Sequence, residues 1–196
     1  IVSNERRDEV VVRIAAACEN QSQAYWVCTL IDESEVLQCQ AAEVTAEQLA
    51  EQLPQVRVGL VHGRMKPAEK AEVMARFKAA EIDLLVATTV IEVGVDVPNA
   101  SLMVIENPER LGLAQLHQLR GRVGRGSKKS HCILLYQTPL SRNGKERLGV
   151  MRESNDGFFI AEKDLELRGP GQVLGTAQTG LMEFRSQLSI NINRFL

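Results

Sequence analysis

Five short runs of apolar residues recur within the first 136 positions and predict buried β-strands. Three of the runs are almost continuously apolar, which is typical of strands covered by helices on both faces of a sheet. The predicted strands are Ala24–Ile31, Val56–Val61, Asp83–Ala87, Ser101–Ile105 and His131–Tyr136.

Segments with helical spacing lie between these strands. Thr45 and Gln48 have the spacing of a capping box, and Leu49 and Leu53 follow one turn apart. Pro67 suits the first turn of a second helix. The apolar face of that second helix comprises Val73, Met74 and Phe77.

A third helix is predicted from Leu113 and Leu116, and it ends at Gly121 and Gly124. Strands that alternate with helices of this length indicate an α/β fold with a mostly parallel sheet and right-handed crossovers. In open sheets of this kind, ligands bind beyond the carboxyl ends of the strands. The segments expected there are His62–Lys66, Thr88–Pro98 and Asn107–Gly112.

The pattern changes after Tyr136. Leu140–Arg152 reads as a polar helix, and Phe158–Gly180 combines a short helical piece with glycine-rich turns. We therefore predict a main domain over residues 1–139 and an appendage over residues 140–196 that packs on it. Ser189–Leu196 gives no signal that can be interpreted.

Charge is unevenly distributed in this chain. The formal net charge is −2, so contact with nucleic acid would depend on local clustering rather than on bulk attraction. Between Arg110 and Lys145 there are eight Lys or Arg residues and no Asp or Glu. A solvated surface face is the alternative reading, and the length of the acid-free run disfavours it.

Cysteine usage and hydropathy limit the class of protein. The four cysteines form no Cys-x-x-Cys pair and have no histidine at metal spacing, so we expect reduced, mostly buried thiols in a cytoplasmic protein. We predict no membrane span and no bound metal. Because the chain begins with Ile, we expect it to be part of a longer polypeptide.

The segment Gln118–Arg125, "QLRGRVGR", carries the most specific chemistry. The planar guanidinium of arginine grips a phosphate through two parallel hydrogen bonds and keeps its proton. Adjacent glycines allow the backbone to turn tightly and approach a ligand. Cations at a helix C-terminus are also favoured by the helix dipole, by roughly 0.3–1 kcal/mol. That effect accounts for one arginine, whereas Arg122 and Arg125 both follow a glycine.

The pattern Gln-x-x-Gly-Arg-x-Gly-Arg resembles the motif in the second motor domain of superfamily-two helicases. The upstream stretch "LLVATTVIEVGVDVP" resembles the preceding motif of that family, through Thr88, Gly94, Asp96 and Pro98. "VHGRM" resembles its His-Gly loop. The three motifs occur in the family's order, and the resemblance implies a RecA-like parallel sheet flanked by helices, with a C-terminal helical hairpin and loop.

Two groups within that superfamily fit the rest of the chain. "LGLAQLHQLRGRVGRG" followed by "DLELRGPGQVLGTAQTG" resembles the RecG branch-migration helicases and the transcription-repair coupling factors. "QAYWVCTLIDESEVLQCQAAE" and "GLVHGRMKPAEK" resemble the RecG group in particular. The coupling factors, which also bind RNA polymerase, remain the alternative within the same class.

The resemblance implies roles for individual residues. Arg122 and Arg125 would contact the γ-phosphate of ATP as catalytic residues. The nucleotide-side residues would be Gln118, Gly94, Asp96 and Gly121. Asp96 also suits a turn or a cap, and Gln118 also suits a plain surface amide.

DNA contacts are implied for a second group of residues. Thr88 would lie near a DNA phosphate, although a strand end also explains it. His62 and Gly63 would either contact DNA or form a simple turn. Arg168 and Gln178 would belong to a lever that senses nucleotide-driven movement and pushes on duplex DNA, with a surface loop as the alternative. His117 and His131 are read as structural.

The sequence contains no Gly-x-x-x-x-Gly-Lys-[Ser/Thr] loop and no Asp-Glu-x-His type metal motif. NTP hydrolysis needs the lysine of that loop and a metal carboxylate. We therefore expect half an active site, inactive alone, with ATP and Mg²⁺ held mainly by a preceding first motor domain. Expected partners are branched or double-stranded DNA and the first motor domain and DNA-binding wedge of the same polypeptide, in a monomer that remodels stalled forks and recombination junctions.

Two readings from other classes also remain open. A nucleic-acid-binding module without a motor would use the basic stretch between Arg110 and Lys145 and would bind DNA tightly by itself. An autonomous nucleotide-binding α/β domain is disfavoured because the phosphate-binding lysine loop is missing.

Overall fold

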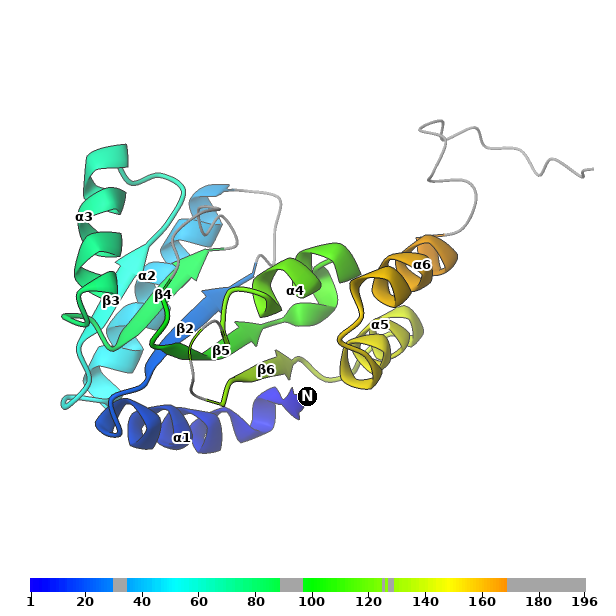
Figure 1. Cartoon of the computed structure of the whole chain (residues 1–196), viewed down its shortest axis with the longest axis horizontal. Coiled ribbons are helices and arrows are strands. Elements are labelled where there is room, and N and C mark those ends of the chain that lie inside the picture. The colour runs from blue at the N-terminus through cyan, green and yellow to red at the C-terminus, as the bar shows by residue number, and fades with distance from the viewer. Residues whose placement is uncertain (30–34, 89–96, 125, 127–128, 169–196) are drawn as a thin grey trace, which may run out of the picture.

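The computed structural model describes residues 1–29, 35–88, 97–124, 126 and 129–168, which form a three-layer α/β sandwich (Figure 1). The described strands form one sheet in the order β1-β6-β5-β2-β4-β3, and every pairing is parallel. They are β1 (Val2–Ser3), β2 (Gln23–Cys28), β3 (Val58–Val61), β4 (Leu84–Thr88), β5 (Ala100–Glu106) and β6 (His131–Tyr136). The predicted parallel α/β fold is confirmed.

Helices cover both faces of this sheet (Figure 1). One face carries α1 (Arg7–Glu19) and α2 (Glu35–Gln52). The other face carries α3 (Pro67–Lys78), α4 (Leu113–Arg120), α5 (Arg142–Glu153) and α6 (Gly157–Arg168). Two short 3₁₀ turns, η1 (Asn4–Arg6) and η2 (Pro108–Arg110), precede α1 and α4.

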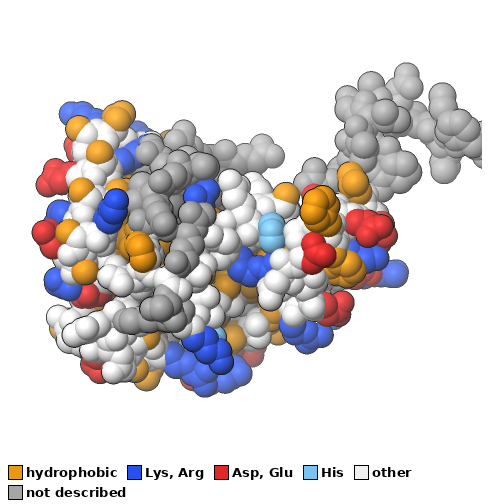
Figure 2. All heavy atoms as spheres, in the orientation of Figure 1, with side chains coloured by type: hydrophobic (Ala, Val, Ile, Leu, Met, Phe, Trp, Pro, Cys, Tyr) orange, Lys and Arg blue, Asp and Glu red, His pale blue; other side chains and the backbone are white. Residues whose placement is uncertain are grey.

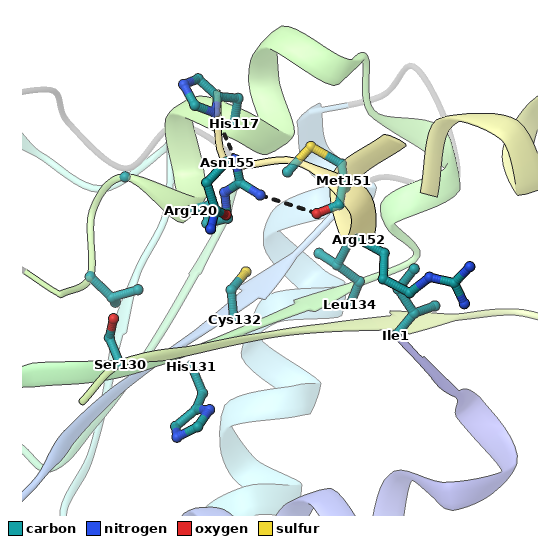
Figure 3. Close-up of a pocket in the computed structure, with 12 residues that line it drawn as sticks. Ile1, His117, Arg120, Ser130, His131, Cys132, Leu134, Met151, Arg152 and Asn155 are labelled. Atoms are coloured by element: carbon teal, nitrogen blue, oxygen red, sulfur yellow. Dashed lines mark hydrogen bonds between the residues drawn. The ribbon is translucent and has the colours of Figure 1, made fainter. Parts of the chain in front are cut away.

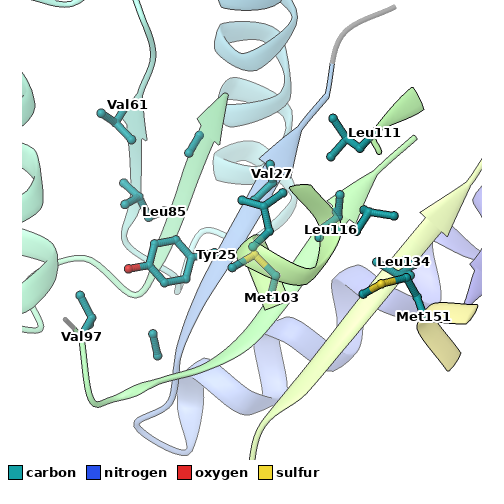
Figure 4. Close-up of a cluster of buried hydrophobic side chains, with 14 of the residues drawn as sticks. Tyr25, Val27, Val61, Leu85, Val97, Met103, Leu111, Leu116, Leu134 and Met151 are labelled. Carbon is teal, nitrogen blue, oxygen red and sulfur yellow. The ribbon is translucent and has the colours of Figure 1, made fainter. Parts of the chain in front are cut away.

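Alternating side chains of the central strand β2 supply both halves of the core. Trp26 is fully buried among α1 and α2, whereas Tyr25 is buried on the opposite face. The Tyr25 ring meets that of Phe77 from α3 edge-on, with ring centroids 5.0 Å apart. Figure 4 shows Tyr25 with Met103 and Leu116 in this cluster. Burial of each such side chain is worth about 1.5–3 kcal/mol.

Several predicted boundaries are confirmed and others are wrong. The second predicted helix begins at Pro67, and the third ends at Arg120 with Gly121 as its cap. The capping box at Thr45 is wrong, because Thr45 lies inside α2, which begins at Glu35. The apolar face of α2 begins with small residues, which weaken the periodic signal. That face comprises Cys39, Ala42, Ala46, Leu49 and Leu53. The third predicted strand starts one residue too early, and the second starts two residues too early.

Neither β1 nor α1 was predicted from the sequence. β1 pairs with the end of β6, and α1 follows it directly. Consecutive valines in α1 favour extended structure and hide the helical period. Val10 and Val11 are buried, whereas Val12 is 67% exposed.

The predicted polar helix after Tyr136 is present as α5, and α6 follows it. Leu148 and Met151 of α5 and Ile160 of α6 are buried in the same cluster as α4 and the sheet. The predicted boundary at residue 140 stays a prediction. Figure 2 shows acidic and basic side chains next to each other over α5 and α6, with exposed hydrophobic side chains among them.

Candidate functional site

The motif "QLRGRVGR" begins on α4 and runs into the loop before β6. α4 forms because Leu113, Leu116 and Leu119 are spaced three apart and all are buried on the sheet. The Gln115 side chain accepts a hydrogen bond from the Gly112 backbone N–H at 3.0 Å, which caps the first turn. The helix stops at Gly121, so the arginines of the motif lie around its last turn.

The glycines of this loop differ in what they require. Gly124 has a φ of +84°, a left-handed conformation that favours glycine. Gly126 packs so closely on Pro98 that an added Cβ would overlap the Pro98 carbonyl oxygen. Gly121 has an ordinary helical conformation, and a Cβ there would lie 3.5 Å from the nearest oxygen, that of Gln118. This chain's own packing therefore needs glycine at positions 124 and 126 but not at 121.

The contact between Gly126 and Pro98 joins two sequence motifs. Pro98 ends the stretch "GVDVP", and Gly126 follows the second arginine of "GRVGRG". The turn that carries Pro98 is held by a hydrogen bond from the Ala100 N–H to the Val97 carbonyl, 3.0 Å long. The segments that the resemblance assigns to the nucleotide therefore meet.

Two arginines of the motif have opposite surroundings. The Arg120 guanidinium donates to the carbonyls of Met151 at 3.1 Å and Ser154 at 2.9 Å, and it lies 3.0 Å from His117 Nδ1. Arg122 is half-buried, and its guanidinium has no hydrogen-bond or ion-pair partner among the described residues. Arg120 is thus bound within the chain, whereas the donors of the Arg122 side chain have no partner among the described residues.

A cavity of about 570 Å³ lies between α4, β6 and α5 (Figure 3). Arg120, Cys132 and Met151 line it, and the Cys132 thiol points from β6 towards α4. Burial raises the pKa of Cys132 to about 11, so the thiol is protonated at neutral pH. Of the predicted nucleotide-side residues, Gly121 lines this cavity, whereas the exposed Gln118 and the neighbouring Arg122 do not.

A second arginine, which lies on α5 itself, also connects α5 to the region of α4. Arg147 of α5 donates to the carbonyl of Leu111 at 2.9 Å and to that of Glu109 at 2.7 Å. These carbonyls lie in and just after η2, immediately before α4. Arg147 therefore ties α5 to the start of α4, and Arg120 ties the end of α4 to the end of α5.

The residues predicted to contact DNA follow strands at the carboxyl edge of the sheet. Thr88 ends β4, pairs with Cys28 and is buried. His62 follows β3, and its Nε2 lies 3.3 Å from the Glu43 carboxylate of α2. The Gly63 carbonyl accepts a hydrogen bond from Lys70 at 2.8 Å. Their contact with DNA stays a prediction, as does that of Arg168, the last residue of α6.

Four predicted site residues lie outside the described part of the chain. They are Gly94, Asp96, Arg125 and Gln178. Within the described ranges, no group of three or more His, Cys, Asp or Glu side chains could hold a metal ion. Over the same residues, no helix has both the length and the apolar character needed to cross a bilayer. The cysteines carry free thiols, and three of them are buried.

Sequence reasoning missed the roles of Arg120 and Arg147. Arg120 was one of eight cations in the basic stretch, and Arg147 was one charge of a polar helix. Their carbonyl partners lie 31 to 38 positions away along the chain. No local pattern reports such contacts. The one feature of the sequence that could have indicated them is that each arginine lies beside the apolar face of its helix.

Comparison with known proteins agrees with this arrangement. Residues 7–127 match the family described as helicase conserved C-terminal domain. Residues 154–194 match the family described as ATP-dependent DNA helicase RecG, domain 3, C-terminal. The first match covers β2 to β5 with the helices from α1 to α4 and the arginine motif, and the second covers α6.

The curated relatives are longer than this chain. The ATP-dependent DNA helicase RecG of Pasteurella multocida is 68% identical over 185 residues, which is 94% of this chain and 27% of that protein. The protein of the same name from Bacillus subtilis is 47% identical over the same shares. The chain thus spans about a quarter of the length of the relatives it matches.

Solved structures give the same result. A RecG bound to a three-way DNA junction superposes with a TM-score of 0.74 at 44% identity, over 88% of this chain and 22% of that chain. Dbp5 of S. cerevisiae, bound to RNA and ADP BeF3, has a TM-score of 0.59 at 18% identity over 78% of this chain and 37% of that one, which concerns the fold alone. The chain belongs to the helicase conserved C-terminal domain family, and within it to the RecG type.

Proposed function

We propose that this chain is the second motor domain of an ATP-dependent DNA translocase of the RecG type. In this proposal, Arg122 and Arg125 complete an ATP site whose other half lies on a first motor domain of the same polypeptide. The observation that carries the proposal is the contrast between Arg120, which has three partners, and Arg122, which has none among the described residues.

An unpartnered, half-buried guanidinium suits a phosphate that arrives from outside the chain. The planar fork of Arg122 would donate to oxygens of the γ-phosphate, and it would do so beside Gly121, which has no side chain of its own. ATP supplies a transferable phosphoryl group with charge that builds up on its oxygens. An arginine that stabilises this charge typically contributes about 10³–10⁵ in rate.

Further nucleotide contacts are part of the same proposal. Gln118 is exposed one turn before Arg122, and Pro98 brings the end of the Gly94–Asp96 motif to the same loop. Mg²⁺ and the remaining phosphates would be held by the phosphate loop and acidic metal motif that this sequence lacks.

The proposed DNA partner is a duplex or a branched junction. A RecG bound to a three-way DNA junction is among the structures similar to this chain, which supports that choice. Thr88, His62 and Gly63 lie at the carboxyl ends of strands, where α/β sheets bind ligands. Phosphate contacts would make binding salt-sensitive and largely independent of sequence. Remodelling of stalled forks and recombination junctions during DNA repair is the activity we propose.

We further propose that α5 and α6 form a lever, together with Arg168 and Gln178. The hydrogen bonds of Arg120 and Arg147 support this role, because they connect α5 to both ends of α4. A shift of α4 on closure of the nucleotide site would therefore carry α5 with it. Energy from that closure would reach the DNA through α6.

The decisive test is Arg122→Ala in the full-length enzyme. We expect DNA-stimulated ATP turnover to fall by about 10³-fold or more, while DNA affinity stays near the wild-type value. Arg76→Ala is the matched control, because Arg76 is an exposed arginine of α3 paired with Glu81. Wild-type turnover in Arg122→Ala would refute the proposed contact with the γ-phosphate.

A further inference from the structure

The outer edge of β6 is only partly covered. β1 contributes two register pairs, Val2 with Leu135 and Ser3 with Tyr136. The earlier residues of β6, His131–Leu134, pair with β5 on their inner side and have no strand beside them on the outer side among the described residues. Alternate backbone N–H and C=O groups along that edge are therefore available to another strand.

A trough runs along this uncovered edge. It is the 570 Å³ cavity between β6 and α5, and Ile1, Cys132 and Leu134 line its floor. Figure 3 shows Ile1 next to Leu134 and Arg152, with Cys132 further along β6. Ile1, directly before β1, is 44% exposed. The trough is lined by Ile1 at one end and by His131, at the start of β6, at the other.

Ile1 and Cys132 line the same cavity. A residue before Ile1 that continued the direction of β1 would therefore enter the space beside Cys132.

We propose that the segment immediately before Ile1 in the full-length protein extends β1 and pairs, in parallel, with His131–Leu134. The register of Val2 opposite Leu135, carried backwards, places Ile1 opposite Leu134 and the three preceding residues opposite Ile133, Cys132 and His131. The matched region is only 27% of the Pasteurella multocida relative, so a polypeptide of that length has further segments that could fill such a trough. Covalent attachment gives this segment a high effective concentration at the edge.

Side chains of the added strand would alternate between the two core clusters. Val2 packs against the cluster of α1 and α2, whereas Ile1 lines the trough on the α5 side. The residue just before Ile1 would therefore join Val2 and Ile133, which packs partly on that same cluster. The residue two before Ile1 would lie over Cys132, below α5.

This arrangement has a consequence for movement between domains. The connection to the rest of the polypeptide would lie in the same cavity as Arg120 and Met151, which hold α4 and α5 together. A pull on that connection would act directly on this joint. The pairing itself does not depend on the proposed role of Arg122, and its test has a readout other than activity.

Amide hydrogen exchange in the full-length protein tests the pairing. Proline at each of the three positions before Ile1 in turn should speed exchange at Cys132–Leu134 by about tenfold or more, for those positions whose N–H faces β6. Amides of Val58–Val61 at the opposite sheet edge are the control and should not change. Unchanged exchange at Cys132–Leu134 in all three variants would overturn the proposal.

A cross-link keeps the proposal testable if the proline variants fail to fold. Cysteine at the position two before Ile1 should be joined to the native Cys132 by a short bis-maleimide, whereas cysteine at the position just before Ile1 should not. Equal yields at both positions would contradict the register. Protection of Cys132–Leu134 that appears only with added DNA, or only at high protein concentration, would assign the edge to DNA or to a second copy and overturn the proposal.

Discussion

The Arg120 guanidinium donates a hydrogen bond to the Ser154 carbonyl over 2.9 Å, and this bond joins the end of α4 to the turn between α5 and α6. The neighbouring Gly157 lies against His117, since a Cβ at that glycine would lie 3.0 Å from His117 Nε2. The last turn of α4 therefore holds α5 and α6 through His117 and Arg120. Arg122, just after the helix, has no side-chain hydrogen bond or ion pair among the described residues.

Replacing Arg120 should loosen α5 and α6 before the sheet unfolds. Arg120→Met keeps much of the aliphatic stem but leaves the carbonyls of Met151 and Ser154 without their donor. Hydrogen bonds to charged groups are worth about 1.5–3 kcal/mol, so we expect a loss of that order. Hydrogen exchange over Leu148–Ile160 and urea unfolding would measure it.

Arg152→Met is the control for that experiment. Arg152 lines the same cavity, but it is exposed and makes no hydrogen bond or ion pair among the described residues. We expect exchange over Leu148–Ile160 to stay near wild type in this variant. If Arg120→Met and Arg152→Met behaved alike, the hydrogen bonds of Arg120 would not be what holds α5.

Gly126→Ala should separate the two loops that meet at Pro98. The added methyl overlaps the Pro98 carbonyl oxygen, which belongs to backbone and cannot rotate away. We expect a loss of about 1–3 kcal/mol and faster exchange of the Ala100 amide, whose hydrogen bond to Val97 holds the Pro98 turn. If the variant kept wild-type stability and wild-type exchange of the Ala100 amide, the close contact between Gly126 and Pro98 would not be needed for the fold.

The isolated 196-residue chain should hydrolyse no ATP, because the phosphate-binding lysine loop is absent from its sequence. Phosphate release by the purified chain, with and without duplex DNA, measures this. The Arg122→Ala chain is the control and should give the same background. Hydrolysis that Arg122→Ala removes would show that the chain holds more than half a site.

Strands with large apolar residues could be predicted from the sequence, whereas elements marked by small residues or by distant pairing could not. The five strands from β2 to β6 were predictable from their apolar runs, three of which are almost continuously apolar, as is typical of parallel strands buried on both faces. The start of α2 was not, because small residues such as Cys39 and Ala42 mark its buried face weakly. β1 has two residues, and its partners Leu135 and Tyr136 in β6 lie far away along the chain, so no local pattern reports the pairing.

For the candidate site too, the sequence reports spacing but not contacts in space. The arginine motif was predictable because Gln118, Gly121 and Arg122 occur at fixed spacing. The different contacts of its arginines were not predictable, since Arg120 and Arg122 are the same residue type two positions apart. Only the position of Met151 and Ser154 in space decides which of the two arginines is bound within the chain.

Gly149→Ala in α5 should stabilise the protein by about 0.5–1 kcal/mol. Gly149 lies in the interior of α5, and a Cβ there would meet nothing within 4 Å. Gly59→Ala in β3 is the opposite case, because its Cβ would lie 2.7 Å from Ile82 Cδ1 in the core. We expect that variant to lose about 1–3 kcal/mol. Thermal unfolding of both variants checks the signs, and a stabilising Gly59→Ala would contradict the packing around Ile82.

The Arg57–Asp83 pair should make stability depend on pH in the acid range. The Asp83 carboxylate accepts hydrogen bonds from the Arg57 side chain at 2.6 and 2.9 Å and from the Arg57 backbone N–H at 2.9 Å. The side-chain hydrogen bond with Arg57 is the main cause that lowers the pKa of Asp83 below its usual value. The unfolded chain holds this proton with a pKa of about 3.9.

Because the folded pKa is the lower one, the pair stabilises the native state fully above about pH 4 and loses this effect as pH falls through the folded pKa. Asp83→Asn should therefore lower the urea midpoint at pH 7, and its difference from wild type should shrink below pH 4. Glu47→Gln, which changes an exposed carboxylate of α2, serves as the control for the loss of one charge. A wild-type midpoint for Asp83→Asn at pH 7, or a difference that grows on acidification, would mean that the Arg57 contact does not stabilise the fold.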